Sequence, residues 1–222
     1  MMNIQDRPYF HNVIREDHLI APFDDNREDA EWIGGIDPGW SSPCAVVLGK
    51  CDGTGRLHIT YAETLVQTGY AEIRDLIDER TSAGCEWLGV DPSMRAHDQQ
   101  TGLSGLEWWR ANRFLPKVYP VAVRGRLSLC RRWLAQDSFQ GGITICHEAA
   151  PLHEALTRYA IEFPPEDVSR MLGEQGPTRA QCLTPNQSHL VDAFSYLLLR
   201  YTDLLASKAF GEHGLPVGHS VA

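Results

Sequence analysis

Three aspartates stand where the sequence could build a site for a divalent cation. Asp37 ends the apolar run IGGID and Asp91 ends the apolar run WLGVD, so each carboxylate is expected at the end of a buried strand. Asp192 lies in NQSHLVDAFSYLLL, which we predict to be an apolar helix. Because carboxylate oxygens are the ligands that Mg²⁺ prefers in proteins, three of them brought together predict a site for Mg²⁺ or Mn²⁺.

The chemistry expected from such a site is two-metal hydrolysis of a phosphodiester, in which two ions lie roughly 3.5–4 Å apart. We expect Asp37 to contact both ions, and Asp91 and Asp192 to bind one ion each. His189 precedes Asp192 by one helical turn and could bind a metal, orient Asp192 or pass a proton to the leaving group. With Ser188 as the predicted N-cap, Asp192 would lie in the first helical turn, near the positive end of the helix dipole.

Each residue also has an ordinary structural interpretation. Asp37 and Asp91 open the turns DPG and DPS, where Asp commonly accepts hydrogen bonds from the backbone beyond it. His189 could be a surface or capping histidine. Asp192 is harder to explain in this way, because its neighbours are apolar and a carboxylate among them needs a partner or a metal.

The order of predicted elements favours an α/β fold of the ribonuclease H-like type. Strands at 33–37, 44–50 and 57–66 form an antiparallel three-strand meander, followed by an amphipathic helix at 70–84 and a crossover strand at 86–91. Helices at 106–114, 126–136 and 150–160 then alternate with strands at 117–123 and 143–147. We therefore expect a mixed central sheet flanked by helices, with a β-hairpin insertion over 164–185 before a last helix at 190–206.

These elements divide the chain into three parts. Residues 1–31 are expected to be a linker or N-terminal arm, 32–206 the nuclease domain and 207–222 a mobile tail. The insertion at 164–185 precedes the helix that carries His189 and Asp192. We interpret it as a mobile hairpin that limits access to the metals, with a passive surface hairpin as the alternative.

The charge of this acidic chain is unevenly distributed. The net charge is −9, but residues 93–132 hold eight basic and only two acidic residues, a local charge of +6. A basic stripe on an acidic body can bind a phosphate backbone; the alternative is a set of ordinary solvated helix faces. The expected DNA-binding residues are Arg95, Arg110, Arg113, Lys117, Arg124, Arg126, Arg131 and Arg132.

Several classes of protein are disfavoured. No apolar run approaches the ~18 residues that a membrane span requires, so no membrane association is expected. The sequence lacks the phosphate-loop pattern of ATPases, the GxSxG pattern and the HExxH pattern. The six cysteines form no CxxC pair and are expected to be buried, reduced thiols rather than zinc ligands.

The three motifs resemble those of the C-terminal nuclease domain of the bacteriophage terminase large subunit. GIDPG (35–39) resembles the first acidic motif of that family, LGVDPS (88–93) the second, and HLVDAFSYLLL (189–199) the last, which reads HxxDA followed shortly by Tyr. Residues 143–163 resemble the strand and helix that precede the hairpin. The resemblance covers about residues 32–206. The loop after Asp91 is longer than the family pattern and contains Asp98, which could be an extra ligand or have no role at the site.

The resemblance implies a metal-dependent endodeoxyribonuclease that cuts double-stranded viral DNA concatemers during genome packaging in the host cell cytoplasm. It implies as partners an ATPase motor domain of the same polypeptide, if this chain is a fragment, together with the portal and the small terminase subunit. Two alternatives stay open. One is another ribonuclease H-like nuclease, such as a Holliday-junction resolvase, and the other is a non-catalytic nucleotide-binding domain.

Overall fold

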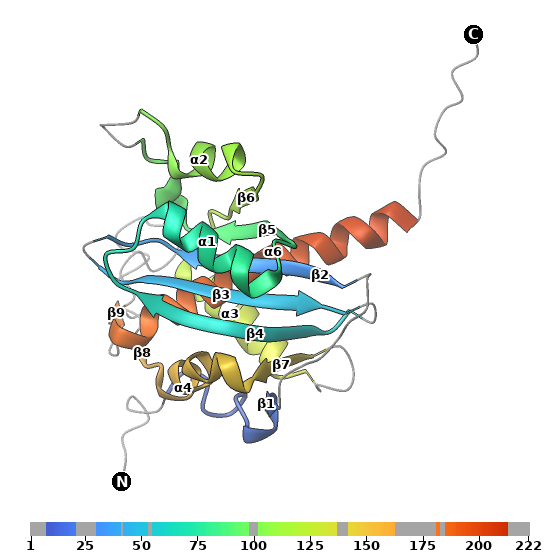
Figure 1. Cartoon of the computed structure of the whole chain (residues 1–222). Helices are drawn as coiled ribbons and strands as arrows, with labels where there is room; N and C mark the ends of the chain where they lie inside the picture. The colour runs from blue at the N-terminus through green and yellow to red at the C-terminus, as the bar shows by residue number, and fades with distance from the viewer. Residues whose placement is uncertain are drawn as a thin grey trace, which may run out of the picture.

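A seven-stranded mixed sheet forms the centre of the molecule (Figure 1). The computed structural model describes residues 8–20, 30–40, 42–52, 55–97, 102–136, 142–162, 181–182 and 185–212. Strands β2 (Glu31–Asp37), β3 (Cys44–Cys51) and β4 (Leu57–Leu65) form the predicted antiparallel meander. The order across the sheet is β1-β7-β4-β3-β2-β5-β6, and β5 (Cys85–Val90) runs parallel to β2.

Three further strands run parallel to their neighbours. β6 (Leu115–Val118) pairs with β5, β7 (Ile143–Cys146) pairs with β4, and β1 (Leu19–Ile20) pairs with β7. The antiparallel meander with added parallel strands confirms the predicted mixed sheet. Between α4 and α6, β8 (Ile161–Glu162) pairs antiparallel with β9 (Gln181–Cys182), as expected for the base of a hairpin. The remainder of the predicted 164–185 insertion, and Asp98, lie outside the described residues.

Helices cover both faces of the sheet and create two hydrophobic cores (Figure 1). On one face, α1 (Tyr70–Thr81) and α2 (Gly105–Ala111) cover residues such as Ile36, Leu48 and Val90. On the other, α3 (Val123–Leu134), α4 (Ala150–Arg158) and α6 (Pro185–Glu212) cover Ile33 and Val47. No helix in the described part of the chain is long and apolar enough to cross a membrane.

Part of the segment expected to be a linker or N-terminal arm, residues 1–31, packs against the domain. Phe10 is fully buried in the core under α3 and α4, and β1 extends the sheet at its edge. His18 is also buried: its Nε2 donates to the carbonyl of Leu134 at 3.0 Å, and its Nδ1 accepts from the backbone N–H of Arg15 at 3.0 Å. Burial lowers the pKa of His18, which favours this neutral tautomer. Residues 8–20 therefore belong to the folded unit.

The last helix begins earlier than predicted. α6 starts at Pro185 rather than after an N-cap at Ser188, because proline is well suited to the first turn of a helix, where its missing N–H costs no hydrogen bond. Asp192 consequently lies two turns into α6, so the expectation of a carboxylate in the first turn was wrong. The helix dipole falls off within the first turn and does not explain the position of Asp192.

The cysteines behave as ordinary core residues. Cys44, Cys51, Cys85, Cys130 and Cys146 are buried and form no disulfide. Burial raises the pKa of Cys44 and of Cys85 to about 12, so both remain thiols at neutral pH. Cys182 has no described side chain.

Candidate active site

Strand alternation directs two of the three predicted aspartates to the α6 face. Asp37 ends β2 and Asp91 follows β5 directly. These strands are parallel neighbours, with Ile36 opposite Val90, so their carboxyl ends meet at one edge. Ile36 and Val90 belong to the core under α1 and α2. Because successive strand residues point to opposite faces, Asp37 and Asp91 point to the face that α6 covers.

A pair of glycines allows α6 to come close to the sheet at this point. Gly35 and Gly89 stand opposite each other in β2 and β5. A Cβ added to Gly35 would lie 2.1 Å from the carbonyl oxygen of Ala193, and one added to Gly89 would lie 2.0 Å from that of Tyr196. Any side chain at either position would push α6 away, so these two glycines set the distance from Asp192 to the strand ends.

Each carboxylate is held by a specific neighbour. His189 Nδ1 donates to Asp37 Oδ2 at 2.7 Å, so His189 orients Asp37 rather than Asp192. The backbone N–H of Ser93 donates to Asp91 Oδ1 at 2.7 Å, and the hydroxyl of Tyr196 donates to Asp91 Oδ2.

Asp192 forms an ion pair with Arg126, which the sequence analysis assigned to the DNA-binding stripe. Arg126 Nη1 lies 2.8 Å from Asp192 Oδ1 and 2.9 Å from Ser195 Oγ, and the guanidinium stacks 4.6 Å from the ring centre of Tyr196. Arg126 is buried, with 7% of its surface exposed. Its side chain therefore points into the site from α3, and its charge faces Asp192.

The pKa values show that the three carboxylates influence one another. Burial raises the pKa of Asp192 to about 6, the charge of Arg126 lowers it, and the charges of Asp37 and Asp91 raise it. Burial also raises the pKa of Asp37, against the effect of its hydrogen bond with His189. The same hydrogen bond raises the pKa of His189. Loss of solvent is thus the main cost of charging Asp37 and Asp192, and repulsion among the carboxylates adds to it.

Asp91 differs from the other two carboxylates. Burial acts to raise its pKa, but the hydrogen bonds from Ser93 and Tyr196 outweigh that effect and hold the pKa below the usual range. Burial raises the pKa of Tyr196, which remains a hydrogen-bond donor. Asp91 is therefore the carboxylate most firmly kept in its charged form.

In this arrangement the three aspartates do not form the expected metal-binding site. Within the described residues, no three or more His, Cys, Asp or Glu side chains are arranged so that together they could hold a metal ion. Each carboxylate instead has a protein partner, namely His189 for Asp37, Tyr196 for Asp91 and Arg126 for Asp192.

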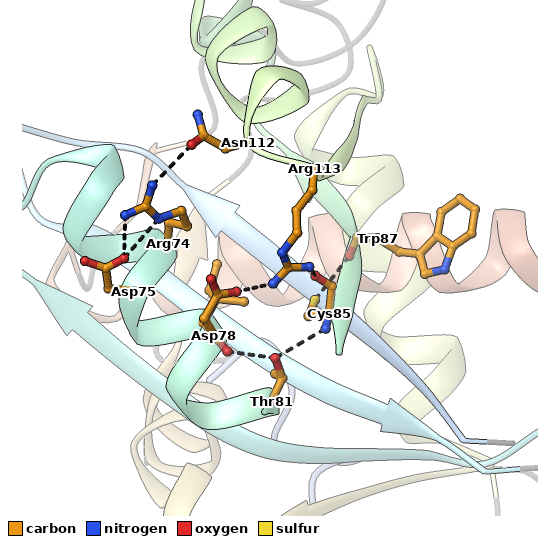
Figure 2. Close-up of polar contacts among 9 residues, drawn as sticks. Arg74, Asp75, Asp78, Thr81, Cys85, Trp87, Asn112 and Arg113 are labelled. Atoms are coloured by element: carbon orange, nitrogen blue, oxygen red, sulfur yellow. Dashed lines mark hydrogen bonds and ion pairs between the residues drawn. The ribbon is translucent and has the colours of Figure 1, made fainter. Parts of the chain in front are cut away.

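The residues of the predicted basic stripe differ in their exposure and in their contacts. Arg113 donates to the carbonyl of Cys85 at 2.9 Å and pairs with Asp78, and so ties the end of α2 to α1 and β5 (Figure 2). Lys117 pairs with Asp203 at 2.7 Å. Arg131 donates to the carbonyl of Tyr9 at 2.9 Å. Exposed residues of the set are Arg95, Arg110, Arg124 and Arg132.

Sequence reasoning gave no role to Arg126 at the site, or to Tyr196 and Ser195. Tyr196 carried a signal, since it is the tyrosine that follows the HxxDA motif. Arg126 carried none, because a charge count cannot tell an arginine that points inward from one that points to solvent.

Comparison with known proteins relates this geometry to solved structures. No protein-family model and no curated protein sequence matches the chain. The large terminase of the thermophilic bacteriophage D6E superposes with a TM-score of 0.65 at 13% identity, over 90% of this chain and 46% of that one. The chain thus spans less than half of the D6E protein.

Two isolated nuclease domains align over most of their length. The P22 large terminase nuclease domain has a TM-score of 0.56 at 14% identity and aligns over 87% of this chain and 92% of that one. The large terminase nuclease of the thermophilic phage G20c has a TM-score of 0.52 at 11% identity, over 87% and 98%. The resemblance noted in the motifs is confirmed at the level of the fold: this chain has the ribonuclease H-like fold of the nuclease domain of phage large terminases.

Proposed function

We propose that this chain is a metal-dependent endonuclease that cuts double-stranded viral DNA concatemers during genome packaging. The observation that carries the proposal is the meeting of Asp37, Asp91 and Asp192 at one edge of the sheet, from three distant segments of the chain. The likeness in fold to phage terminase nuclease domains supports it.

The donor chemistry fits hard divalent cations. The cluster offers carboxylate oxygens, which Mg²⁺ and Mn²⁺ prefer. Burial raises the pKa of Asp192 to about 6, and the charges of Asp37 and Asp91 raise it as well, so a bound cation would stabilise its charged form. The G20c nuclease domain was solved with bound zinc, which supports a metal site in this fold. We infer that two Mg²⁺ or Mn²⁺ ions bind to these carboxylates while the neighbouring side chains keep them oriented.

The roles of the residues follow from their contacts. Bound divalent ions would neutralise charge on the phosphate and supply an activated water. Asp37 and Asp91 would hold them from the strand ends and Asp192 from α6. His189 orients Asp37, while Ser93 and Tyr196 fix both oxygens of Asp91. Arg126 keeps a positive charge beside Asp192 and limits repulsion among the three carboxylates.

Partners follow from the same proposal. Double-stranded DNA is the substrate, and the exposed arginines of the 93–132 segment contact its backbone. The D6E large terminase, less than half of which this chain covers, was solved with ADP and with ATP-γ-S. We infer that an ATPase motor domain works with this nuclease if the chain is part of a longer polypeptide. The portal and the small terminase subunit would be further partners, in the host cell cytoplasm.

A plasmid-cleavage assay tests the proposal. Supercoiled DNA should be nicked and linearised with Mg²⁺ or Mn²⁺ and left intact in EDTA. Asp37→Asn should abolish cutting, whereas Asp75→Asn, which changes an exposed carboxylate on α1, should not. Cutting that persists in EDTA or in Asp37→Asn would refute the proposal. A four-way junction should be cut no faster than a linear duplex of the same sequence; a strong preference for the junction would indicate a resolvase.

A further inference from the structure

A separate cleft opens on the α1 and α2 side of the sheet, beyond the ends of β2 and β5. Its volume is about 720 Å³, within the ~300–1,000 Å³ range of ligand pockets. It is lined by the turn after β2, the start of α1, the 3-10 helix after β5 and the start of α2. The lining residues that matter here are Trp40, Tyr70, Ser93, His97, Leu103 and Trp108.

The lining combines aromatic faces with an absence of charge. Trp40 is 66% exposed, and Trp108 is held rigidly by Tyr70, at 5.5 Å between ring centres, and by Trp109, at 5.2 Å. None of the described residues that line the cleft is an acid, a lysine or an arginine. The carboxylate of Glu107, on α2, accepts hydrogen bonds from the backbone N–H and the hydroxyl of Ser104.

Two residues that line the cleft connect it to the carboxylate cluster. Pro38, which lines the cleft, directly follows Asp37. Ser93 also lines it, and its backbone N–H donates to Asp91 at 2.7 Å. A ligand in the cleft therefore lies on the other side of the same two strand ends. Arg95 and Arg110 are exposed and lie on the same two elements that supply Ser93 and Trp108.

We propose that this cleft binds an unstacked nucleobase of the DNA strand whose phosphate lies at the carboxylates. This inference rests on the proposed nuclease function and names how the strand is held. Every base has a π-face that stacks on aromatic side chains regardless of sequence, which suits an uncharged aromatic lining. Arg95 and Arg110 supply positive charge for the adjoining phosphates. Trp40 and Trp108 provide the stacking faces.

A binding experiment in EDTA tests the inference without requiring cleavage. Two fluorescein-labelled duplexes of equal double-stranded length are compared by anisotropy, one blunt and one with a single-stranded overhang of about three nucleotides. The wild-type chain should bind the overhang duplex at least about fivefold more tightly, because an unpaired base can enter the cleft. Trp40→Ala should weaken binding of the overhang duplex roughly tenfold and leave the blunt duplex unchanged.

Two variants make the result specific. Trp40→Phe keeps an aromatic face and should retain most of the preference for the overhang. Val121→Ala removes an exposed apolar side chain outside the cleft and should change nothing. Equal binding of both duplexes by the wild type overturns the inference, as does a Trp40→Ala variant that binds like the wild type. A chain that cuts DNA but shows no overhang preference refutes the base site alone, whereas one that prefers overhangs but never cuts refutes the nuclease.

Discussion

Arg126 Nη1 lies 2.8 Å from Asp192 Oδ1, and both side chains are largely removed from solvent, at 9% and 25% exposure. The arginine is the positive charge that stands beside the most perturbed of the three carboxylates. Since burial still raises the pKa of Asp192 to about 6, one guanidinium does not offset the loss of solvent and the charges of Asp37 and Asp91.

The first prediction concerns the pH dependence of stability in Arg126→Gln. The folded-state pKa of Asp192 is raised from 3.8 to about 6, so ionisation of Asp192 lowers stability as pH rises through that window. Without Arg126 the pKa rises further and the loss extends to higher pH. The variant should lose about 3 kcal/mol relative to the wild type at pH 8 and clearly less at pH 5, measured by urea unfolding. Equal losses at both pH values would contradict this electrostatic account.

The second prediction concerns the paired glycines. Gly35→Ala and Gly89→Ala each place a Cβ about 2 Å from a carbonyl oxygen of α6, so the helix must move. Each should lower the free energy of unfolding by about 3 kcal/mol or more and greatly reduce cleavage. Gly125→Ala is the matched control, because Gly125 is exposed in α3 and alanine favours a helix by about 1 kcal/mol. A Gly35→Ala chain of wild-type stability would show that α6 is not held against the strands.

The third prediction concerns the hydroxyl of Tyr196, which donates to Asp91. Tyr196→Phe removes the hydroxyl that donates to Asp91, so the pKa of Asp91 should rise and its carboxylate should lose its orientation. The Mg²⁺ concentration for half-maximal cleavage should increase about 10- to 100-fold, the usual effect of losing a partner of a metal ligand. Tyr61→Phe is the control, since that hydroxyl donates to Glu63 within β4, away from the cluster. The same metal requirement in both variants would rule out a role for Tyr196.

The fourth prediction distinguishes surface arginines from structural ones. Arg110→Ala and Arg132→Ala change exposed side chains and should weaken binding to unrelated duplexes alike, each reducing the slope of log K against log salt by about 1. Arg113→Ala should instead lower stability, because Arg113 bonds Cys85 and Asp78 (Figure 2). Salt titrations and thermal unfolding of the three variants separate the two effects. An unchanged salt slope in Arg110→Ala would remove it from the DNA interface.

The sequence predicted the elements that have strong local patterns. The meander and the crossover strand before Asp91 were found where apolar runs and turn residues indicated them, and the last helix was found with an earlier start. Each strand-end aspartate could be identified because a short apolar run stops at it. The meeting of Asp37 and Asp91 follows from parallel pairing of two strands, which the motif order favoured.

What the sequence could not predict depends on register and side-chain direction. Gly35 and Gly89 are opposite each other only because β2 and β5 pair in one register, 54 positions apart in the chain. The side chain of Arg126 points inward because α3 packs beside α6, where Arg126 bonds Ser195. β1 has two residues, too few for a periodic pattern, and is recognisable only because β7 accepts it.

The glycine pair leaves α6 with a flat backbone surface beneath it, and a flat surface resists approach but not sliding along the helix axis. Position along that axis is also held further on, where Asp203 bonds Lys117 at 2.7 Å and the hydroxyl of Tyr119 at 3.3 Å. Asp203 lies eleven residues beyond Asp192, a span of about 16 Å at 1.5 Å per residue. The bonds of His189, Tyr196 and Asp192 hold α6 at the cluster, and Asp203 adds a second point of attachment further along the same helix.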